Sequence, residues 1–478
     1  MRILLLVPPN KNKENVVRDL LYGCWCKGKR IGGTSLPPLS ILQIAAVLKP
    51  EGCELKLIDA PASGLSVSDL CLDIKNYDVV ILSTSAMTWE DDLSVLSSLK
   101  KAHSGLKVIL FGYYPTCNPK YLLSFPAVDI IVRSEPEQII RDLIRKMADN
   151  QPWQEIKGIS FNLNNQYQEN PPYPFMENLD ELPFIDRTLL AKNADYFNPI
   201  IKKTPYTLML TSRGCAGECI FCTSPLFYGA KVRCRSVDNV LEELRLIKHM
   251  GYKEVFFRDE LFTFSRERTL AICEQIIKAK LSIKWICSTR ADFLDKELMG
   301  IMKAAGCHML RMGVESGNQN LLDKAKKGIN LAQVRAVFKS AKQLNIDTHA
   351  HLVLGIPGEN DKTIKNSMRF VQKIDPTIVT YGVLIPYKGT ELFENLRAEN
   401  KQANATMENN LPEAVLSKYL TNFSLEQLER YVRKCYQNFY LKPGYAFKRL
   451  ICCGSFEEFK RILFAAKNIM SFMFNKQT

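Results

Sequence analysis

The sequence predicts an α/β protein in which a doubly wound, Rossmann-like domain precedes a partial (β/α)6 barrel and an α-helical C-terminal extension. Short, almost wholly apolar segments alternate with amphipathic ones in residues 1–150 and again in residues 204–396. Buried strands that alternate with amphipathic helices form parallel sheets covered on both faces. After Leu396 the strand pattern ends and only helical periodicity remains, which predicts the extension over residues 397–478.

The first unit, residues 1–150, is expected to form a doubly wound sheet. Ligands of such sheets bind beyond the carboxyl ends of the strands, where this sequence has loops rich in Gly, Ser, Thr and Pro. No G-x-G-x-x-G follows the first strand, which argues against a nicotinamide dinucleotide. The expected strands are Ile3–Val7, Glu54–Ile58, Val79–Ser83, Lys107–Phe111 and Asp129–Val132, and the expected helices are Leu39–Lys49, Leu65–Asn76, Asp91–Ala102 and Pro136–Asn150.

Residues 151–203 are predicted to be a linker that holds a hairpin at Gly158–Gln168, followed by a proline-rich stretch that precludes a long helix. The second unit then repeats strand and helix six times, which implies a barrel or partial barrel with its active site at the strand C-termini. The expected strands are Tyr206–Thr211, Glu254–Arg258, Lys284–Ser288, Met309–Val314, Thr348–Leu354 and Ile378–Leu384, and the helices are Val237–Met250, Arg266–Ala279, Asp295–Ala305, Asn318–Lys326, Leu331–Leu344 and Asp361–Ile374.

Two helices are expected in the C-terminal extension, over residues 425–440 and 457–474. In the second, apolar residues from Phe459 to Met473 recur at helical spacing, so we expect the helix to pack onto the barrel. A basic helix rich in Met and Phe could instead touch a membrane surface or an apolar substrate entrance.

Composition narrows the class of protein. The N-terminal apolar run stops at Pro8 and no 18-residue apolar stretch follows, so we expect a cytoplasmic chain. Fifteen Cys in a cytoplasmic protein favour metal or redox use of a few and burial of the rest. The net charge of +14 fits a lysine-rich surface, and would indicate nucleic acid only if the cations gathered on one face.

One group of cysteines has ligand spacing. Cys215, Cys219 and Cys222 lie on the loop after the first expected barrel strand, where their sulfurs can converge. Thiolates are the ligands of iron–sulfur clusters, and three of them leave one iron of a [4Fe–4S] cluster open. Zinc is the alternative, but the next candidates for a fourth ligand, Cys234 and His249, are too far along the chain for a zinc finger.

This C-x3-C-x2-C spacing, with an aromatic residue before the last Cys, resembles the radical S-adenosylmethionine superfamily. The resemblance implies that the three cysteines are the catalytic metal ligands. Segments at successive strand ends are also similar to the family: residues 257–263, 288–292, 313–317, 355–359 and 386–392. The S-adenosylmethionine contacts that the resemblance implies are Phe221, Glu260, Ser288, Arg290, Gly313, Glu315, Ser316, Gly355 and Pro357.

These residue types suit such a ligand on physical grounds. Glycines permit close backbone approach, Glu315 can accept hydrogen bonds from ribose hydroxyls or pair with an ammonium group, and Arg290 or Arg311 can hold a carboxylate. By the resemblance, the open iron binds the amino and carboxylate groups of S-adenosylmethionine, and one electron from a flavodoxin-type or ferredoxin-type reductant cleaves it. The 5′-deoxyadenosyl radical then removes hydrogen from an unactivated C–H bond.

The order of the domains resembles the cobalamin-binding class of that superfamily, which contains methylases of unactivated carbon and the anaerobic cyclase of bacteriochlorophyll synthesis. The chain has no D-x-H-x-x-G motif, so it offers no lower axial histidine in that context. Tyr113 and Tyr114 also replace a glycine and a histidine of the usual G-G-x-H-P-T pattern. The cobalamin contacts implied by the resemblance are Pro9, Ser83, Thr84, Ser85, Gly112, Tyr114, Pro115, Thr116, Arg133 and Glu135.

Several functions stay open at this stage. The leading hypothesis is cobalamin-dependent methylation of an unactivated carbon, and the second is radical cyclisation or rearrangement of a tetrapyrrole-like or lipid-like small molecule. A non-catalytic cobalamin or iron–sulfur protein is a third. A transfer RNA methylthiotransferase is disfavoured because the chain lacks a second cysteine trio. His349 and His351 alternate on one strand and share a face, where they could orient substrate or be structural.

Overall fold

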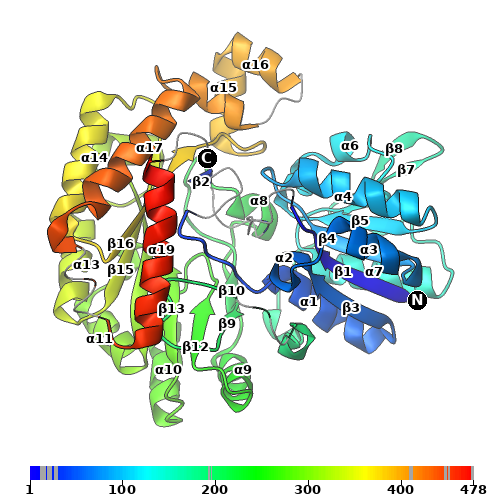
Figure 1. Ribbon diagram of the computed structural model, residues 1–478, viewed down its shortest axis with the longest axis horizontal. Helices are drawn as coiled ribbons and strands as arrows, with labels where there is room; N and C mark the ends of the chain where they lie inside the picture. The colour runs from blue at the N-terminus through cyan, green and yellow to red at the C-terminus, as the bar shows by residue number, and fades with distance from the viewer. Residues whose placement is uncertain are drawn as a thin grey trace.

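Two α/β units lie side by side in the computed structural model of the protein, and the C-terminal helices pack on the second unit (Figure 1). The structure describes residues 1–10, 18, 24–25, 31–191, 194, 196–408, 413–445, 449 and 453–474. In this part of the chain no helix is long and apolar enough to cross a membrane.

The first sheet has the strand order β3-β1-β4-β5-β6-β7-β8. Its first five strands are parallel, and β7 and β8 form the expected hairpin, which extends this sheet in antiparallel fashion. Helices α1 and α7 bury one face of the sheet, and α3 and α4 bury the other, so the unit is doubly wound as predicted. The strands are β1 (Arg2–Val7), β3 (Glu54–Asp59), β4 (Val79–Ser83), β5 (Lys107–Phe111), β6 (Ile130–Val132), β7 (Ile159–Leu163) and β8 (Gln166–Glu169). The helices are α1 (Leu39–Leu48), α2 (Ala60–Ser63), α3 (Val67–Asp73), α4 (Trp89–Ala102), α5 (Tyr113–Cys117), α6 (Pro119–Leu122) and α7 (Pro136–Ala148).

The second sheet contains all six expected strands, in the order β16-β15-β14-β13-β12-β9, and they are parallel throughout. It is an open, partial barrel. The strands are β9 (Tyr206–Met209), β12 (Glu254–Phe257), β13 (Lys284–Thr289), β14 (Cys307–Glu315), β15 (Asp347–Leu354) and β16 (Ile378–Leu384). The helices are α8 (Ser224–Tyr228), α9 (Val237–His249), α10 (Arg266–Lys278), α11 (Lys296–Ala304), α12 (Gln319–Lys324), α13 (Leu331–Gln343) and α14 (Asp361–Ile374).

Two small features of the second unit were not predicted. β10 (Ser212–Arg213) pairs with β11 (Arg233–Cys234) beside the cysteine loop. β2 (Cys24–Trp25), which comes from the residue range assigned to the first unit, pairs with β16 at the edge of the second sheet. β2 has only two residues, too few to show a periodic pattern in the sequence, and it is a strand only because it pairs with β16.

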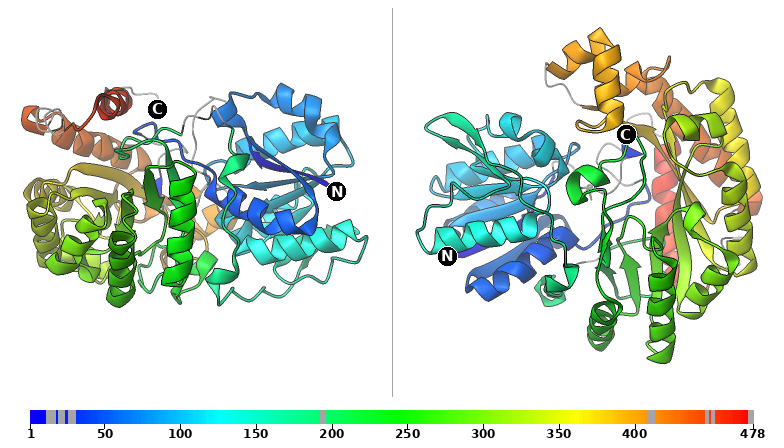
Figure 2. Two further views of the ribbon diagram at one scale, coloured as in Figure 1. Left: turned by 90° about the horizontal axis from the view of Figure 1, so that it is seen from below. Right: turned by 180° about the vertical axis from the view of Figure 1, so that it is seen from behind.

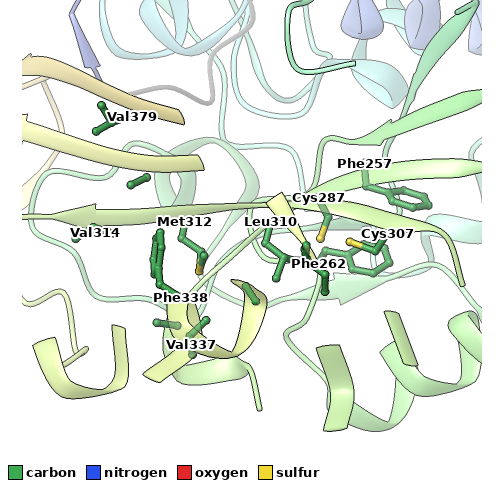
Figure 3. Close-up of a cluster of buried hydrophobic side chains, with 14 of the residues drawn as sticks. Phe257, Phe262, Cys287, Cys307, Leu310, Met312, Val314, Val337, Phe338 and Val379 are labelled. Atoms are coloured by element: carbon green, nitrogen blue, oxygen red, sulfur yellow. The ribbon is translucent and has the colours of Figure 1, made fainter. Parts of the chain in front are cut away.

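The core of the second unit lies between the sheet and its covering helices (Figure 3). Trp285 is completely buried, contacts the rings of Phe257 and Phe262, and donates its indole N–H to the carbonyl of Ala305. Cys273, Cys287 and Cys307 are buried in the same core. These thiols therefore serve as small apolar side chains, as expected for most of the scattered cysteines.

The helical C-terminal extension is confirmed. It comprises α15 (Glu391–Glu399), α16 (Lys401–Glu408), α17 (Leu425–Tyr440) and α19 (Phe456–Phe474). α17 packs on β16, and α19 packs on α17 and lies along the second unit (Figures 1 and 2). Only part of the apolar surface of α19 is buried: Phe456, Leu463 and Phe474 are each at least half exposed.

Buried ion pairs join the two units. Arg213 pairs with Glu137 at 2.5 Å, and Arg233 pairs with Glu135 at 2.5 Å. All four side chains are almost completely shielded from solvent. Since α7 carries or adjoins the two carboxylates and β10 and β11 carry the arginines, these pairs fix the first unit against the strand ends of the second.

Replacing Arg213 with methionine is expected to lower the free energy of unfolding by about 3–5 kcal/mol, because Glu137 stays buried without its cation. Urea denaturation of the full chain would measure the loss. Lys231→Met is the matched control, since the Lys231–Glu177 pair is about 70% exposed and solvent screens its attraction, so its loss should hardly change stability. Equal destabilisation by the two variants would show that the buried pair has no special role.

Candidate active site

The cysteine loop begins where β9 ends, and Asp259 anchors it. This buried carboxylate accepts hydrogen bonds from the backbone N–H of Thr211 at 2.7 Å and from the hydroxyl of Ser212 at 2.6 Å. Gly214 follows with a φ of 87°, and a Cβ there would lie 2.3 Å from the carbonyl oxygen of Lys231. Only glycine fits that position, so the loop enters the site along one defined path.

Cys215, Cys219 and Cys222 are all partly buried on this loop. The Sγ of Cys215 accepts a hydrogen bond from the N–H of Gly217 at 3.4 Å. Burial raises the pKa of the Cys215 thiol, and burial raises the pKa of Cys222 to about 12. Cys219 raises the pKa of both thiols further, and Cys215 also raises the pKa of Cys222. Metal binding to these thiols must release protons.

The trio does not form a ligand set for a single metal ion. Across the described ranges, no three His, Cys, Asp or Glu side chains are grouped closely enough to hold one ion. Tetrahedral zinc needs four such ligands around one centre, whereas a cluster is held by thiolates that each bind a different iron. The donors present therefore suit an iron–sulfur cluster better than zinc.

Arg290, at the end of β13, lies against the cysteine loop. A Cβ at Gly217 would lie 2.9 Å from one of its guanidinium nitrogens, so the absence of a side chain there permits the approach. Arg290 also pairs with Asp292 at 2.9 Å. Burial opposes its charge, but Asp292 and the nearby Cys219 and Cys215 raise the pKa of Arg290 above its ordinary value. A permanent cation thus stands beside the trio.

Glu315 ends β14 at a break in the register between β14 and β15. Its φ is 59°, a conformation that is uncommon for a residue with a side chain and is often found at functional sites. It forms a buried ion pair with Lys327 at 2.8 Å, and a Cβ at Gly313 would collide with both charged groups. Burial opposes the charge of Lys327, but Glu315 and Cys219 raise its pKa. Lys327 was not predicted, because nothing in the run Lys324–Gly328 distinguishes it from a surface lysine.

Glu260, just after β12, is half-buried, and its two carboxylate oxygens are shielded from solvent without a hydrogen-bond partner among the described residues. Burial raises the pKa of Glu260 to about 8. The charge of Glu260 raises the pKa of Cys215, so the two groups lie close together in the same site. A buried carboxylate without a donor is costly and has a vacant hydrogen-bonding position for a ligand.

The remaining predicted S-adenosylmethionine contacts lie at the same edge of the sheet. Ser288 is near the end of β13, and Gly355 and Pro357 follow β15, with Gly355 at a φ of 102°. Phe221 is partly buried against the apolar cluster that contains Ile220. Ser316 differs from these, since it is completely buried and its hydroxyl lies 3.4 Å from that of Ser367 on α14, an interaction that holds a helix.

In the first unit, the predicted cobalamin contacts follow β1, β4, β5 and β6. Pro9 and Ser83 are buried at the ends of β1 and β4. The next two hydroxyls have partners within the protein: Thr84 donates to Asp92 at 2.7 Å, and Ser85 lies 3.0 Å from the hydroxyl of Thr88. Asp92 in turn pairs with Arg18 at 2.6 Å.

The loop after β5 carries Gly112, whose φ of 126° lies in the range that favours glycine. Its neighbours fill the space around it. Tyr114 stacks on Trp89, and Pro115 is buried beside it in α5. The hydroxyl of Thr116 donates to the carbonyl of Gly112 at 2.7 Å. Tyr113 crosses to the second unit, where it packs on Tyr387 and donates to the carbonyl of Lys388.

Arg133 and Glu135 are engaged elsewhere. Arg133 pairs with Glu169 of the β7–β8 hairpin at 2.8 Å, and Glu135 pairs with Arg233. The hydroxyls of Thr84, Ser85 and Thr116 at these strand ends are likewise bonded within the protein. The charges of Arg133 and Glu135 are already neutralised by protein partners, which favours a structural role for these two side chains.

His349 and His351 project from β15 into the interior of the partial barrel, with ring centroids 4.0 Å apart. His351 contacts Arg311 at 3.2 Å and Thr380 at 2.7 Å. Burial and Arg311 lower the pKa of His349, and burial, His349 and Arg311 lower that of His351. Both imidazoles are therefore neutral at physiological pH.

Comparison with known proteins places this site in a family. The model of the radical SAM superfamily matches residues 209–371, which span β9 to α14. A protein of Pyrococcus horikoshii, named only as an uncharacterized methyltransferase, is 30% identical over 447 residues, which cover 93% of each chain. The anaerobic magnesium-protoporphyrin IX monomethyl ester cyclase of Cereibacter sphaeroides is 25% identical over 90% of this chain and 72% of its own.

Among solved structures, the cobalamin-dependent S-adenosylmethionine radical enzyme OxsB, with aqua-cobalamin and S-adenosylmethionine bound, superposes with a TM-score of 0.71. The match covers 98% of this chain and 71% of OxsB at 18% identity, so it confirms the arrangement of the whole fold. Fold, cysteine loop and near-complete alignment with a 30% identical relative agree. The chain belongs to the radical S-adenosylmethionine superfamily, whose enzymes use a [4Fe–4S] cluster and S-adenosylmethionine.

Proposed function

We propose that this enzyme methylates an unactivated carbon of a small molecule, with cobalamin as the methyl carrier. The observation that carries the proposal is the alignment over 93% of both chains with a relative named as a methyltransferase. It is supported by a fold that follows a cobalamin-dependent radical enzyme over 98% of this chain.

Cys215, Cys219 and Cys222 hold the cluster in this proposal, because they are the cysteines on the loop that follows β9. Their thiols lose protons as iron binds, and the cation of Arg290 beside the loop favours the thiolate form. When bound, the cluster and S-adenosylmethionine together supply the radical that activates the substrate carbon. A small flavin or iron–sulfur protein supplies the electron from outside.

The S-adenosylmethionine site uses the groups at the ends of β12 to β15. Glu260 accepts hydrogen bonds from the ammonium group, since its two oxygens have no donor of their own. Arg290 holds the carboxylate, and Glu315, oriented by Lys327, accepts from ribose hydroxyls. Ser288, Gly313, Gly355 and Pro357 permit close approach of the ligand, and Phe221 shields it from solvent.

Cobalamin, when bound at the strand ends of the first unit, supplies the methyl group. Gly112 and the short loops after β1, β4 and β5 form the surface for it, and the first unit offers no histidine on these loops as a lower ligand. Tyr113 links this surface to the second unit through its contacts with Tyr387 and Lys388.

Isotope transfer tests the proposal. The full chain, reconstituted with iron and sulfide under anaerobic conditions and supplied with cobalamin, a reductant and S-adenosylmethionine carrying a deuterated methyl group, is offered a candidate substrate. We expect the product to gain the labelled methyl group and 5′-deoxyadenosine to form with it. A product without label, formed together with 5′-deoxyadenosine, would reject methylation.

Radical cyclisation is the second candidate, favoured by 25% identity with the porphyrin ester cyclase over 90% of this chain. The same experiment separates the two. Cyclisation gives a product that has lost hydrogen and contains no atom from S-adenosylmethionine.

A further inference from the structure

A pocket of about 600 Å³ lies inside the partial barrel, between the inner face of its sheet and the C-terminal helices. Strand residues such as Phe256 and Thr380 form one wall. Tyr436 and Tyr440 of α17 and the apolar side of α19 form the other. Of α19, the residues that line it are Ile462, Leu463, Ala465, Ala466, Ile469, Met470 and Met473. Most of the pocket wall is therefore apolar.

Three polar side chains of the pocket, Arg311, His349 and His351, lie on two neighbouring strands of the sheet. Arg311 of β14 lies opposite His349 of β15 in the register of the sheet, and both are more than nine-tenths buried. Neither ring nitrogen of His349 has a hydrogen-bond partner among the described residues. A neutral imidazole can donate one hydrogen bond and accept another, so His349 has a vacant donor position facing this space.

All charged side chains that line the pocket within the described part of the chain are basic. Arg311 lies deep inside, and Lys442 and Arg449 lie nearer the surface. No carboxylate is among the described lining residues. A buried guanidinium beside a neutral, unpartnered imidazole is suited to an anionic group and disfavours a cation.

The polar end of this pocket adjoins the proposed S-adenosylmethionine site. A guanidinium nitrogen of Arg311 lies 3.4 Å from the hydroxyl of Ser288. His351 is level with Gly313 in the register of β14 and β15. A molecule held by Arg311 and His349 would therefore have its head group on the side of the radical source and its body toward α19.

We propose that this pocket binds the substrate, and that the substrate is an amphipathic anion: an apolar body under α19 with one carboxylate or phosphate group between Arg311 and His349. This proposal deepens the function proposed above and rests on it. The exposed apolar residues that α19 presents beside the pocket, such as Leu463 and Met470, line the route by which such a body enters.

Binding of simple probes to the full chain tests this assignment, without cofactors or turnover. Isothermal titration calorimetry would compare dodecanoate, dodecyl phosphate, dodecanol and dodecylamine, each below its micellar concentration. We expect at least one of the two anions to bind at least tenfold more tightly than the alcohol, and the amine to bind more weakly than the alcohol. The stronger of the two anions identifies the head group. Equal binding of all four would overturn the proposal.

Variants locate the binding site. Arg311→Met is expected to remove the preference for the anion, a loss of at least tenfold, while dodecanol binding changes less than twofold. Ala465→Phe fills the apolar end and should weaken every probe, and Ala466→Trp does the same from a less buried position if the first variant fails to fold. Unchanged binding by Arg311→Met, or by a folded filling variant, contradicts the assignment.

Phe456→Ala is the matched control. Phe456 lies on the same helix, is 68% exposed and does not line the pocket, so its loss should leave probe binding unchanged. A different outcome is a chain that binds no monomeric probe but sediments with phosphatidylcholine–phosphatidylglycerol vesicles. If Phe456→Ala then abolished that sedimentation, the result would instead assign α19 to a membrane surface. A chain that binds the anions but transfers no methyl group contradicts the proposed reaction and leaves the pocket assignment intact.

Discussion

Replacing Cys222 with alanine is expected to abolish cluster assembly and S-adenosylmethionine cleavage together. Two thiolates cannot hold three of the four irons, so the cluster loses its site and the radical its source. The measurements are iron and sulfide content after anaerobic reconstitution, the visible absorption of the cluster, and 5′-deoxyadenosine by chromatography. We expect each to fall to background, with the same result for Cys215→Ala and Cys219→Ala.

Cys234→Ala is the control for this experiment. Cys234 is partly buried on β11, beside the loop but outside the trio, and should retain both the cluster and the cleavage activity. Full iron loading in Cys222→Ala, or stoichiometric zinc in the oxygen-free wild-type chain, would contradict the role proposed for the trio.

Replacing Glu260 with glutamine is expected to have opposite effects on stability and on ligand binding. Burial raises the pKa of Glu260 from 4.5 to about 8. Between these two pH values, the folded chain keeps a proton on Glu260 that the unfolded chain has released. Stability therefore falls as pH rises through this window, and glutamine removes the loss. From the difference between these two pKa values, the variant gains at most about 5 kcal/mol at pH 8 and above.

The same change should weaken S-adenosylmethionine binding at least tenfold, because a charge-assisted hydrogen bond to the ammonium group contributes about 1.5–3 kcal/mol. Urea denaturation of the cofactor-free chain at pH 5 and pH 8.5 measures the effect on stability. Equilibrium binding of S-adenosylmethionine to the reconstituted chain measures the effect on the ligand. Glu242→Gln, at an exposed position on α9, should change neither. A variant that is less stable than wild type at pH 8.5 would contradict the prediction that the ionised, shielded carboxylate of Glu260 destabilises the fold.

The sequence was sufficient for the order of the elements and for the chemistry of the cysteine loop. Strands such as β1 and β4 are almost wholly apolar because both faces of a parallel sheet are covered, and this local pattern can be read in the sequence. The spacing of Cys215, Cys219 and Cys222 is equally local, since one short loop carries all three ligands.

Only the tertiary structure decided which charged side chains meet. Glu135 and Arg233 are 98 positions apart, and no periodicity relates them, yet their ion pair joins the two units. Lys327 and Glu315 likewise meet only in the folded chain, and β2 is a strand only because it pairs with the edge strand β16. The pocket under α19 combines residues from both ends of the chain. Contacts of this kind depend on how whole elements pack, and packing is a property of the folded chain that local sequence patterns do not record.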